Sequence, residues 1–236
     1  MKPVLILQHL SSDGPAYLQT WLERHELPFE VVDSERGGRA PADLTGHSAL
    51  AILGGEMSAN DDLPGLRDAE ALFRLALEHA VPTLGHCLGG QLMARALGAE
   101  IGASPAPEIG WHTVTVADCP EAADWFESPG EHTVFQWHEE AFALPPQVVA
   151  LAGSAACPHQ AFSIGPHLAM QFHVELDAEK LQRWTHDASA QAIGEPRYAS
   201  VQRPEQMLAQ AAQHLLRQQA LADRIYRCWI DGVGAS

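Results

Sequence analysis

Short apolar runs alternate with longer helical patterns along the first half of this chain. The apolar runs predict strands at Val4–Leu7, Phe29–Val32, Ala49–Leu53 and Val81–Leu84. The segments Gly14–His25 and about Gly65–Ala80 have the apolar spacing of helices with one buried face. Because strand–helix–strand units in this order are typical of parallel sheets, the chain is predicted to be an α/β protein with a central, mostly parallel sheet.

The second half of the chain has a different pattern. Strand-like stretches broken by Pro and Gly predict a mixed sheet with hairpins at Thr113–Val116, Thr133–Trp137, Val148–Ala152, Ala161–Ile164 and Leu168–Phe172. After Glu175 the pattern becomes helical, with an apolar stripe interrupted at Gln219. We interpret this stripe as packing on the sheet, and an oligomer or partner surface is the alternative. The length of 236 residues predicts one domain over 1–236, with a catalytic core of about 1–190 and a C-terminal helical extension of about 191–236.

The net charge of the chain limits the classes of partner that it is expected to bind. The formal net charge is −16, so the mean surface field repels phosphate backbones and anionic headgroups, and neither nucleic acid nor membrane is expected as a partner. The apolar run Val4–Leu7 is too short for a signal-peptide core or a membrane span. The four cysteines form no CxxC pair and the 13 histidines form no HExxH or HxH pattern. We therefore expect a cytoplasmic protein with no metal site and no cofactor.

The strongest chemical signal is Gly85-x-Cys87-x-Gly89, between an apolar strand and the helical pattern Gln91–Leu97. A sharp strand-to-helix turn forces strained backbone angles, which small flanking residues tolerate. Such a turn lifts a thiol clear of the sheet and places it at a helix N-terminus, where unpaired N–H groups favour the thiolate. Cys87 is therefore a candidate nucleophile, and a buried free cysteine in a glycine-rich turn is the alternative.

Two further segments supply the groups that a nucleophilic thiol needs. His173 follows the apolar run Leu168–Met170, so it should emerge at a strand end, where ligand-binding loops gather. Glu175 lies two residues further on, which in extended geometry places both side chains on one face and lets the carboxylate orient the ring. The third strand ends in two glycines, and the N–H groups of Gly55 and Leu88 would form a two-donor oxyanion hole. A satisfied core histidine and a plain strand-to-helix turn are the alternative interpretations.

At these places the sequence resembles the class I glutamine amidotransferases, whose glutaminase domains hydrolyse the side-chain amide of glutamine, and in particular the glutaminase domain of GMP synthase. The likeness covers roughly residues 4 to 180, and its segments are Gly-His-Cys-Leu-Gly-Gly-Gln at 85–91, Phe-His-Val-Glu at 172–175, Gly-Gly-Glu-Met-Ser at 54–58, Pro-Glu-Ile-Gly-Trp at 107–111 and Gln-Trp-His at 136–138. The family usually has proline where this chain has Glu56 and Val174, which bears on loop shape and not on a catalytic atom.

The resemblance implies a flavodoxin-like three-layer sandwich and a role for each site residue. Cys87 would be the nucleophile, His173 the general base and acid, and Glu175 the residue that holds His173. Gly55 and Leu88 would supply the oxyanion hole. The glutamine head group would be bound by Gly54, Gln91, Gln136, Trp137 and His138.

Three functions fit these expectations. In the first, a Cys-His-Glu triad forms a γ-glutamyl thioester from glutamine and releases glutamate and ammonia, the ammonia being used by a separate synthetase subunit. In the second, a γ-glutamyl hydrolase or peptidase uses the same thioester to release another amine from a γ-glutamyl compound. The third is a non-enzymatic binding protein on the same fold, which the presence of every catalytic residue type disfavours. The first two both take a small-molecule substrate.

Overall fold

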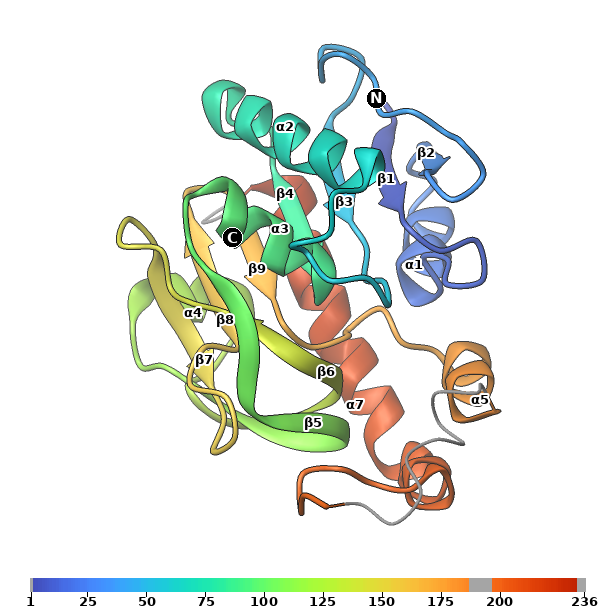
Figure 1. The fold of residues 1–236 in the computed structure, drawn as a ribbon, viewed down its shortest axis with the longest axis vertical. Helices are drawn as coiled ribbons and strands as arrows, with labels where there is room; N and C mark the ends of the chain where they lie inside the picture. Colours follow the sequence, from blue (N-terminus) through green and yellow to red (C-terminus); the bar gives the residue numbers. More distant parts are fainter. Residues whose placement is uncertain (1, 187–196, 233–236) are drawn as a thin grey trace.

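One sheet organises the protein. The computed structural model describes residues 2–186 and 197–232, and in these residues nine strands form a single sheet in the order β2-β1-β3-β4-β9-β8-β7-β5-β6 (Figure 1). The first five strands in this order are parallel: β2 (Phe29–Asp33), β1 (Val4–Gln8), β3 (Ala49–Ile52), β4 (Thr83–His86) and β9 (His167–Met170). The other four pair in antiparallel fashion: β8 (Ala161–Ile164), β7 (Val149–Gly153), β5 (Ile101–Val116) and β6 (Gly130–Phe142).

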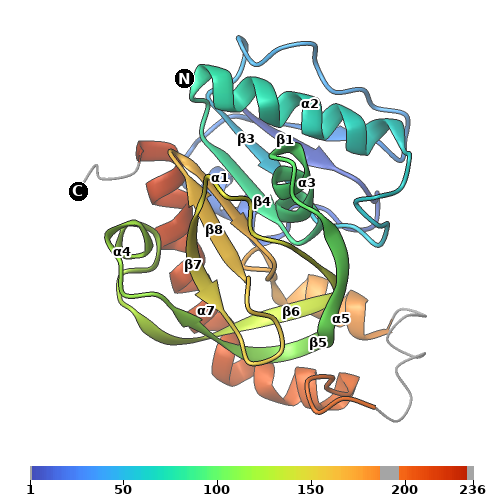
Figure 2. The same cartoon turned by 60° about the vertical axis from the view of Figure 1, so that its left-hand side comes forward.

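Helices cover both faces of this sheet (Figure 2). On one face lie α2 (Pro64–His79) and α3 (Leu88–Ala96), and on the other α1 (Tyr17–Arg24), α4 (Pro120–Phe126) and α7 (Pro204–Asp231). In β1, Leu5 and Leu7 pack with the first group of helices, whereas Val4 and Ile6 pack with the second. This alternation follows from the two-residue period of a strand, and it places one apolar core on each face of this part of the sheet. A further helix, α5 (Ala178–His186), packs against α7.

Several elements differ from their predicted bounds. The fourth strand begins at Thr83 and continues to His86, later than predicted, and α4 was not predicted. The strand β5 begins at Ile101 and not at Thr113, although Pro105 and Pro107 within it argue against a strand. Its pairing register with β6 shifts between Ala103 and Glu108, so both prolines lie in an irregular stretch that donates no ladder hydrogen bonds.

The C-terminal helix α7 is continuous from Pro204 to Asp231, so the polar residue Gln219, at which the apolar stripe is interrupted, does not break the helix. Its buried side chains Ala222, Ile225, Tyr226 and Trp229 belong to the apolar core that it shares with α1 and the sheet. The prediction that this stripe packs on the sheet is therefore confirmed for the second half of α7, whereas Leu208 near the start of the helix is exposed. Residues 191–196 and 233–236 of the predicted extension, and residues 187–190 at the end of the predicted core, lie outside the described residues. No helix in the described part of the chain combines the length and hydropathy that a membrane span needs.

Candidate active site

Cys87 lies at the sharp turn between β4 and α3, with φ 48° and ψ −107°. A positive φ is rare for a residue with a side chain and costs on the order of 1–3 kcal/mol, so the surrounding structure must enforce it. The two flanking glycines show how. A Cβ at Gly85 would lie 2.5 Å from the Met93 Sδ, and a Cβ at Gly89 would lie 2.0 Å from the Ile52 carbonyl oxygen. Glycine is therefore required at both positions, as the sequence predicted for a nucleophile turn.

The thiol is enclosed by polar atoms. Cys87 is 6% exposed, and its Sγ lies 3.7 Å from the Trp137 carbonyl oxygen and 3.4 Å from the Gln171 Nε2. The Gln171 Oε1 in turn accepts a hydrogen bond from the Gln91 Nε2 at 3.3 Å. Gln171 was not singled out from the sequence, although it lies two residues before His173. The thiol is therefore buried among polar atoms, with little of it open to solvent.

His173 and Glu175 are in contact, although not for the predicted reason. The segment after β9 is a turn and not extended chain, with the Leu176 N–H donating to the His173 carbonyl at 3.3 Å. This turn brings the His173 Nδ1 within 2.7 Å of the Glu175 Oε1, and both side chains are buried. Nδ1 donates to the carboxylate, which leaves Nε2 without a hydrogen-bond partner among the described residues. The arrangement is that of an oriented base with one ring nitrogen ready to act.

The side chains of His173 and Cys87 both lie next to Gly54. A Cβ at this glycine would lie 3.1 Å from the His173 Cε1 and 3.8 Å from the Cys87 Cβ, so both side chains line the same point. Burial disfavours the imidazolium, but the charges of Glu175 and Cys87 outweigh burial and raise the pKa of His173 to about 10. At neutral pH the geometry therefore favours an imidazolium beside the sulfur, which is a proton donor for a leaving group.

The two proposed oxyanion donors are on adjoining segments. In the described residues neither the Gly55 N–H nor the Leu88 N–H has an acceptor within hydrogen-bond distance. Leu88 is the first residue of α3, where N–H groups have no partner within the helix. The loop that carries Gly55 is tied to the end of β6, because the Ser58 hydroxyl donates to the Glu140 carboxylate at 2.8 Å. Both N–H groups are thus free to meet a developing negative charge.

The predicted head-group residues divide into two sets. Gln91 lies close to the thiol through Gln171, and its Nε2 also donates to the Glu140 carbonyl at 3.0 Å. The side chains of the second set are directed elsewhere: the Gln136 Nε2 donates to the Gln160 Oε1 at 2.8 Å, and the His138 Nε2 lies 3.2 Å from Glu108. At His138, therefore, the backbone is what remains available to a ligand, whereas the Gln136 Oε1 is buried and has no hydrogen-bond partner among the described residues.

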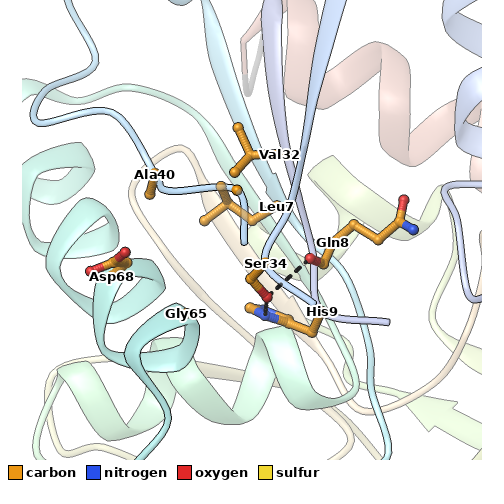
Figure 3. A pocket seen from close by; sticks show the side chains of 9 residues that line it. Leu7, Gln8, His9, Val32, Ser34, Ala40, Gly65 and Asp68 are labelled. Atoms are coloured by element: carbon orange, nitrogen blue, oxygen red, sulfur yellow. Dashed lines mark hydrogen bonds between the residues drawn. The ribbon is translucent and has the colours of Figure 1, made fainter. Parts of the chain in front are cut away.

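Two cavities lie at the carboxyl ends of β1 and β2, beside this site. The smaller has a volume of about 10 Å³, and Figure 3 shows the Ser34 hydroxyl directed at the His9 ring on its wall. The larger, of about 390 Å³, is lined in part by His9 and Met57. Neither is lined by Cys87 or His173. The smaller has room for about one water molecule. Because neither candidate residue lines either cavity, the cavities do not identify the candidate site.

A thiol at a strand-to-helix turn, with a His–Glu pair after a neighbouring strand, agrees with a known family. The family model for Glutamine amidotransferase class-I matches residues 22–188 of this chain. The chain belongs to this family. The predicted enzyme class is thereby confirmed, and so is the mostly parallel α/β fold, because a crystal structure of a glutamine amidotransferase from Methylobacillus flagellatus matches it with a TM-score of 0.94. That structure is 34% identical, and the match covers 100% of this chain and 97% of that one.

Relatives of this chain in sequence include a synthase subunit and a peptidase. The glutamine amidotransferase-like protein YfeJ of Salmonella typhimurium is 30% identical over 192 residues, which are 77% of this chain and 79% of YfeJ. One subunit of the glutamine-hydrolysing GMP synthase of Thermoplasma acidophilum is 30% identical over 139 residues, 58% of this chain and 67% of that one. Gamma-glutamyl peptidase 3 of Arabidopsis thaliana is 33% identical over 168 residues, 65% of this chain and 64% of that one.

Proposed function

We propose that this chain is a glutaminase in which Cys87, His173 and Glu175 hydrolyse the side-chain amide of glutamine to glutamate and ammonia. The observation that carries the proposal is a thiol on a strained turn next to an imidazole that Glu175 holds at 2.7 Å. The same arrangement gives a nucleophile, a proton donor and a group that orients the donor, which is the set that thioester chemistry needs.

The reaction follows from the positions of these groups. The Cys87 thiolate attacks the amide carbon, a carbon–sulfur bond forms, and the charge on the oxygen is met by the N–H groups of Gly55 and Leu88. The imidazolium of His173 gives the proton on its Nε2 to the amide nitrogen, the carbon–nitrogen bond breaks, and ammonia leaves. The neutral imidazole then takes a proton from water, which attacks the γ-glutamyl thioester and releases glutamate and the thiolate.

We further propose that a separate acceptor enzyme consumes the ammonia. The similarity to the Thermoplasma GMP synthase polypeptide supports this proposal, because that relative is itself named as one subunit of a synthase. A glutaminase that supplies ammonia to an acceptor enzyme is expected to hydrolyse glutamine slowly by itself and faster when that enzyme is bound.

A second candidate function is a γ-glutamyl peptidase, and the similarity to gamma-glutamyl peptidase 3 favours it. The thioester would be the same, but the leaving group would be an amine other than ammonia. Such an enzyme is expected to act at its full rate without any partner.

The test compares two substrates on purified protein. Ammonia release from glutamine and amine release from a γ-glutamyl dipeptide are measured for the wild type, for Cys87→Ala and for Cys157→Ala. Cys157 is a matched control, because it is another buried free cysteine, and its Sγ lies 3.5 Å from the His159 carbonyl oxygen. We expect Cys157→Ala to retain wild-type rates and Cys87→Ala to release nothing from either substrate. Wild-type turnover by Cys87→Ala would refute the proposed chemistry, and the ratio of the two rates in the wild type decides between the candidates.

A further inference from the structure

Lys180 is a buried cation that the proposed chemistry does not use. The chain has only two lysines, and Lys2 is exposed near the N-terminus whereas the Lys180 side chain is fully buried. A lysine is almost never fully buried unless its ammonium is paired, because desolvation of the charge is costly. The partners of Lys180 therefore show what its charge does.

Three acceptors surround the ammonium. The Lys180 Nζ lies 2.9 Å from the Asp13 Oδ1, 3.1 Å from the Gly14 carbonyl oxygen and 3.3 Å from the Glu175 Oε1. All three of its donors are thus engaged. The same Glu175 Oε1 accepts the hydrogen bond from the His173 Nδ1. Asp13, Lys180, Glu175 and His173 therefore form one buried chain of alternating charge that ends at the candidate base.

The helix α5 fixes this ammonium in place. The Asp177 carboxylate accepts the Lys180 backbone N–H at 2.7 Å and so caps the start of the helix. One turn further on, the Trp184 Nε1 donates to the Asp13 Oδ1 at 3.1 Å, and the Trp184 ring lies 5.1 Å from the ammonium. The same ring stands edge-on to the His173 ring, with centroids 4.7 Å apart. The helix thus contacts both ends of the chain of charges.

The other groups that face Glu175 carry no positive charge at neutral pH. The His86 Nε2 lies 3.9 Å from the Glu175 Oε2, and burial lowers the pKa of His86 to about 4. Burial, followed by the charge of Glu175, raises the pKa of Tyr226 well above its usual value, so its phenol is neutral too. Among the described residues, the positive charges next to Glu175 are therefore those of His173, which the reaction takes away, and Lys180, which it does not.

We propose that Lys180 is a positioning residue whose ammonium keeps Glu175 oriented and ionised throughout the catalytic cycle. The inference rests on the proposed function. When His173 gives its proton to the leaving nitrogen, Glu175 loses one cationic partner and keeps Lys180. Without Lys180, a lone buried carboxylate would hold the proton on the imidazole, and thioester hydrolysis would slow because the neutral base is scarce.

The sign and size of the effect follow from electrostatics. Removing a positive charge favours the protonated form of every neighbouring group. We therefore expect Lys180→Met to move the pH limbs, which are the pH values at which the reactivity of Cys87 and His173 is half-maximal, upward. Asp13→Asn removes a negative charge and moves the limbs downward. The Lys180 Nζ lies 3.3 Å from the Glu175 Oε1, which lies 2.7 Å from the His173 Nδ1. A unit charge about 6 Å away at an effective dielectric constant of ~20 corresponds to roughly two pH units for His173, and the shift is smaller for a group further away. Lys180→Arg keeps the charge, so its limbs stay within about half a unit of the wild type.

The experiment measures the alkylation rate of Cys87 by iodoacetamide as a function of pH, together with the pH profile of kcat on glutamine. The variants are Lys180→Met, Lys180→Arg, Asp13→Asn and the control Arg183→Met. Arg183 is on the same helix, and its charge pairs with the exposed Glu179 at 2.9 Å. We expect opposite shifts for Lys180→Met and Asp13→Asn and no shift for Arg183→Met.

The outcomes separate the two proposals. Alkylation needs no substrate, so shifted limbs in a protein that hydrolyses neither substrate would leave the role of Lys180 intact and refute the proposed function. Glutamine hydrolysis with unshifted limbs in folded Lys180→Met would overturn the role of Lys180. If Lys180→Met does not fold, Asp13→Asn decides: limbs at the wild-type pH would overturn the inference, and a downward shift of about one unit or more would support it.

Discussion

Gln218 joins the last helix to the candidate site, and its replacement gives a quantitative test of that connection. It is 1% exposed, its Oε1 accepts the Phe135 N–H at 2.6 Å, and its Nε2 donates to the His173 carbonyl at 3.0 Å. Leucine at this position fills the space but makes neither bond. The His173 carbonyl keeps its bond from Leu176, whereas the Phe135 N–H is left unpaired in the interior.

The expected loss can be summed from these two bonds. One buried orphan donor costs about 1–3 kcal/mol, and one lost hydrogen bond whose acceptor keeps another partner costs about 1 kcal/mol. Gln218→Leu should therefore lower the free energy of unfolding by about 2–4 kcal/mol, which is roughly 5–15 °C in Tm for a protein of this size. Denaturant titration followed by circular dichroism measures the first quantity and a thermal melt the second.

The neighbouring residue supplies the control. Gln219 is half-buried, so Gln219→Leu makes a similar change of side chain without breaking the two bonds. We expect the free energy of unfolding of Gln219→Leu to lie within about 0.5 kcal/mol of the wild-type value. The reasoning is refuted if the two variants lose the same stability, or if Gln218→Leu loses less than about 1 kcal/mol.

Three further predictions concern the glycine turn after Cys87, the contact of Gly54 with His173, and the charge of His173. Gly89→Ala should destabilise the protein by more than ~3 kcal/mol in urea titration, because its Cβ would lie 2.0 Å from a backbone oxygen, whereas Gly46→Ala, with nothing within 4 Å, should not. Gly54→Ala should lower kcat/KM by ~10-fold or more with a near-native melt, because its Cβ would push on the His173 ring at 3.1 Å. The charges of Glu175 and Cys87, outweighing burial, raise the pKa of His173 from 6.5 to about 10, so the stabilisation from its charge is complete below pH 6.5 and is lost as pH rises through about 10. The stability advantage of the wild type over His173→Gln should therefore shrink between pH 7 and pH 10, and a constant difference would contradict the charged base.

The candidate nucleophile was predictable because its requirements lie close together in the sequence. Gly85 and Gly89 flank Cys87, and the close approaches that exclude a side chain at these positions arise where one strand turns into one helix. Two strands of the first half were predictable for a related reason, since β1 and β3 are buried on both faces and are apolar throughout or nearly so.

The support around the base was not predictable from the sequence. Asp13 precedes α1 and Lys180 lies in α5, so only the folded chain brings them together. A lysine in a short polar helix is normally solvent-exposed, and nothing in its neighbours distinguishes Lys180 from such a residue. The contact between His173 and Glu175 was predicted, but through extended backbone, because the residues that follow β9 do not reveal that the chain turns there.

The bond from Gln218 to the His173 carbonyl also has a consequence for biosynthesis. A ribosome releases the strands from β1 to β9 before it has made α7, so the sheet can begin to assemble while the loop that carries His173 still lacks its anchor. Nascent chains and fragments cut short before α7 should therefore possess the cysteine turn but hold the imidazole loosely. The enzyme would gain its full reactivity only as α7 docks, which delays thiol chemistry until that helix has been made.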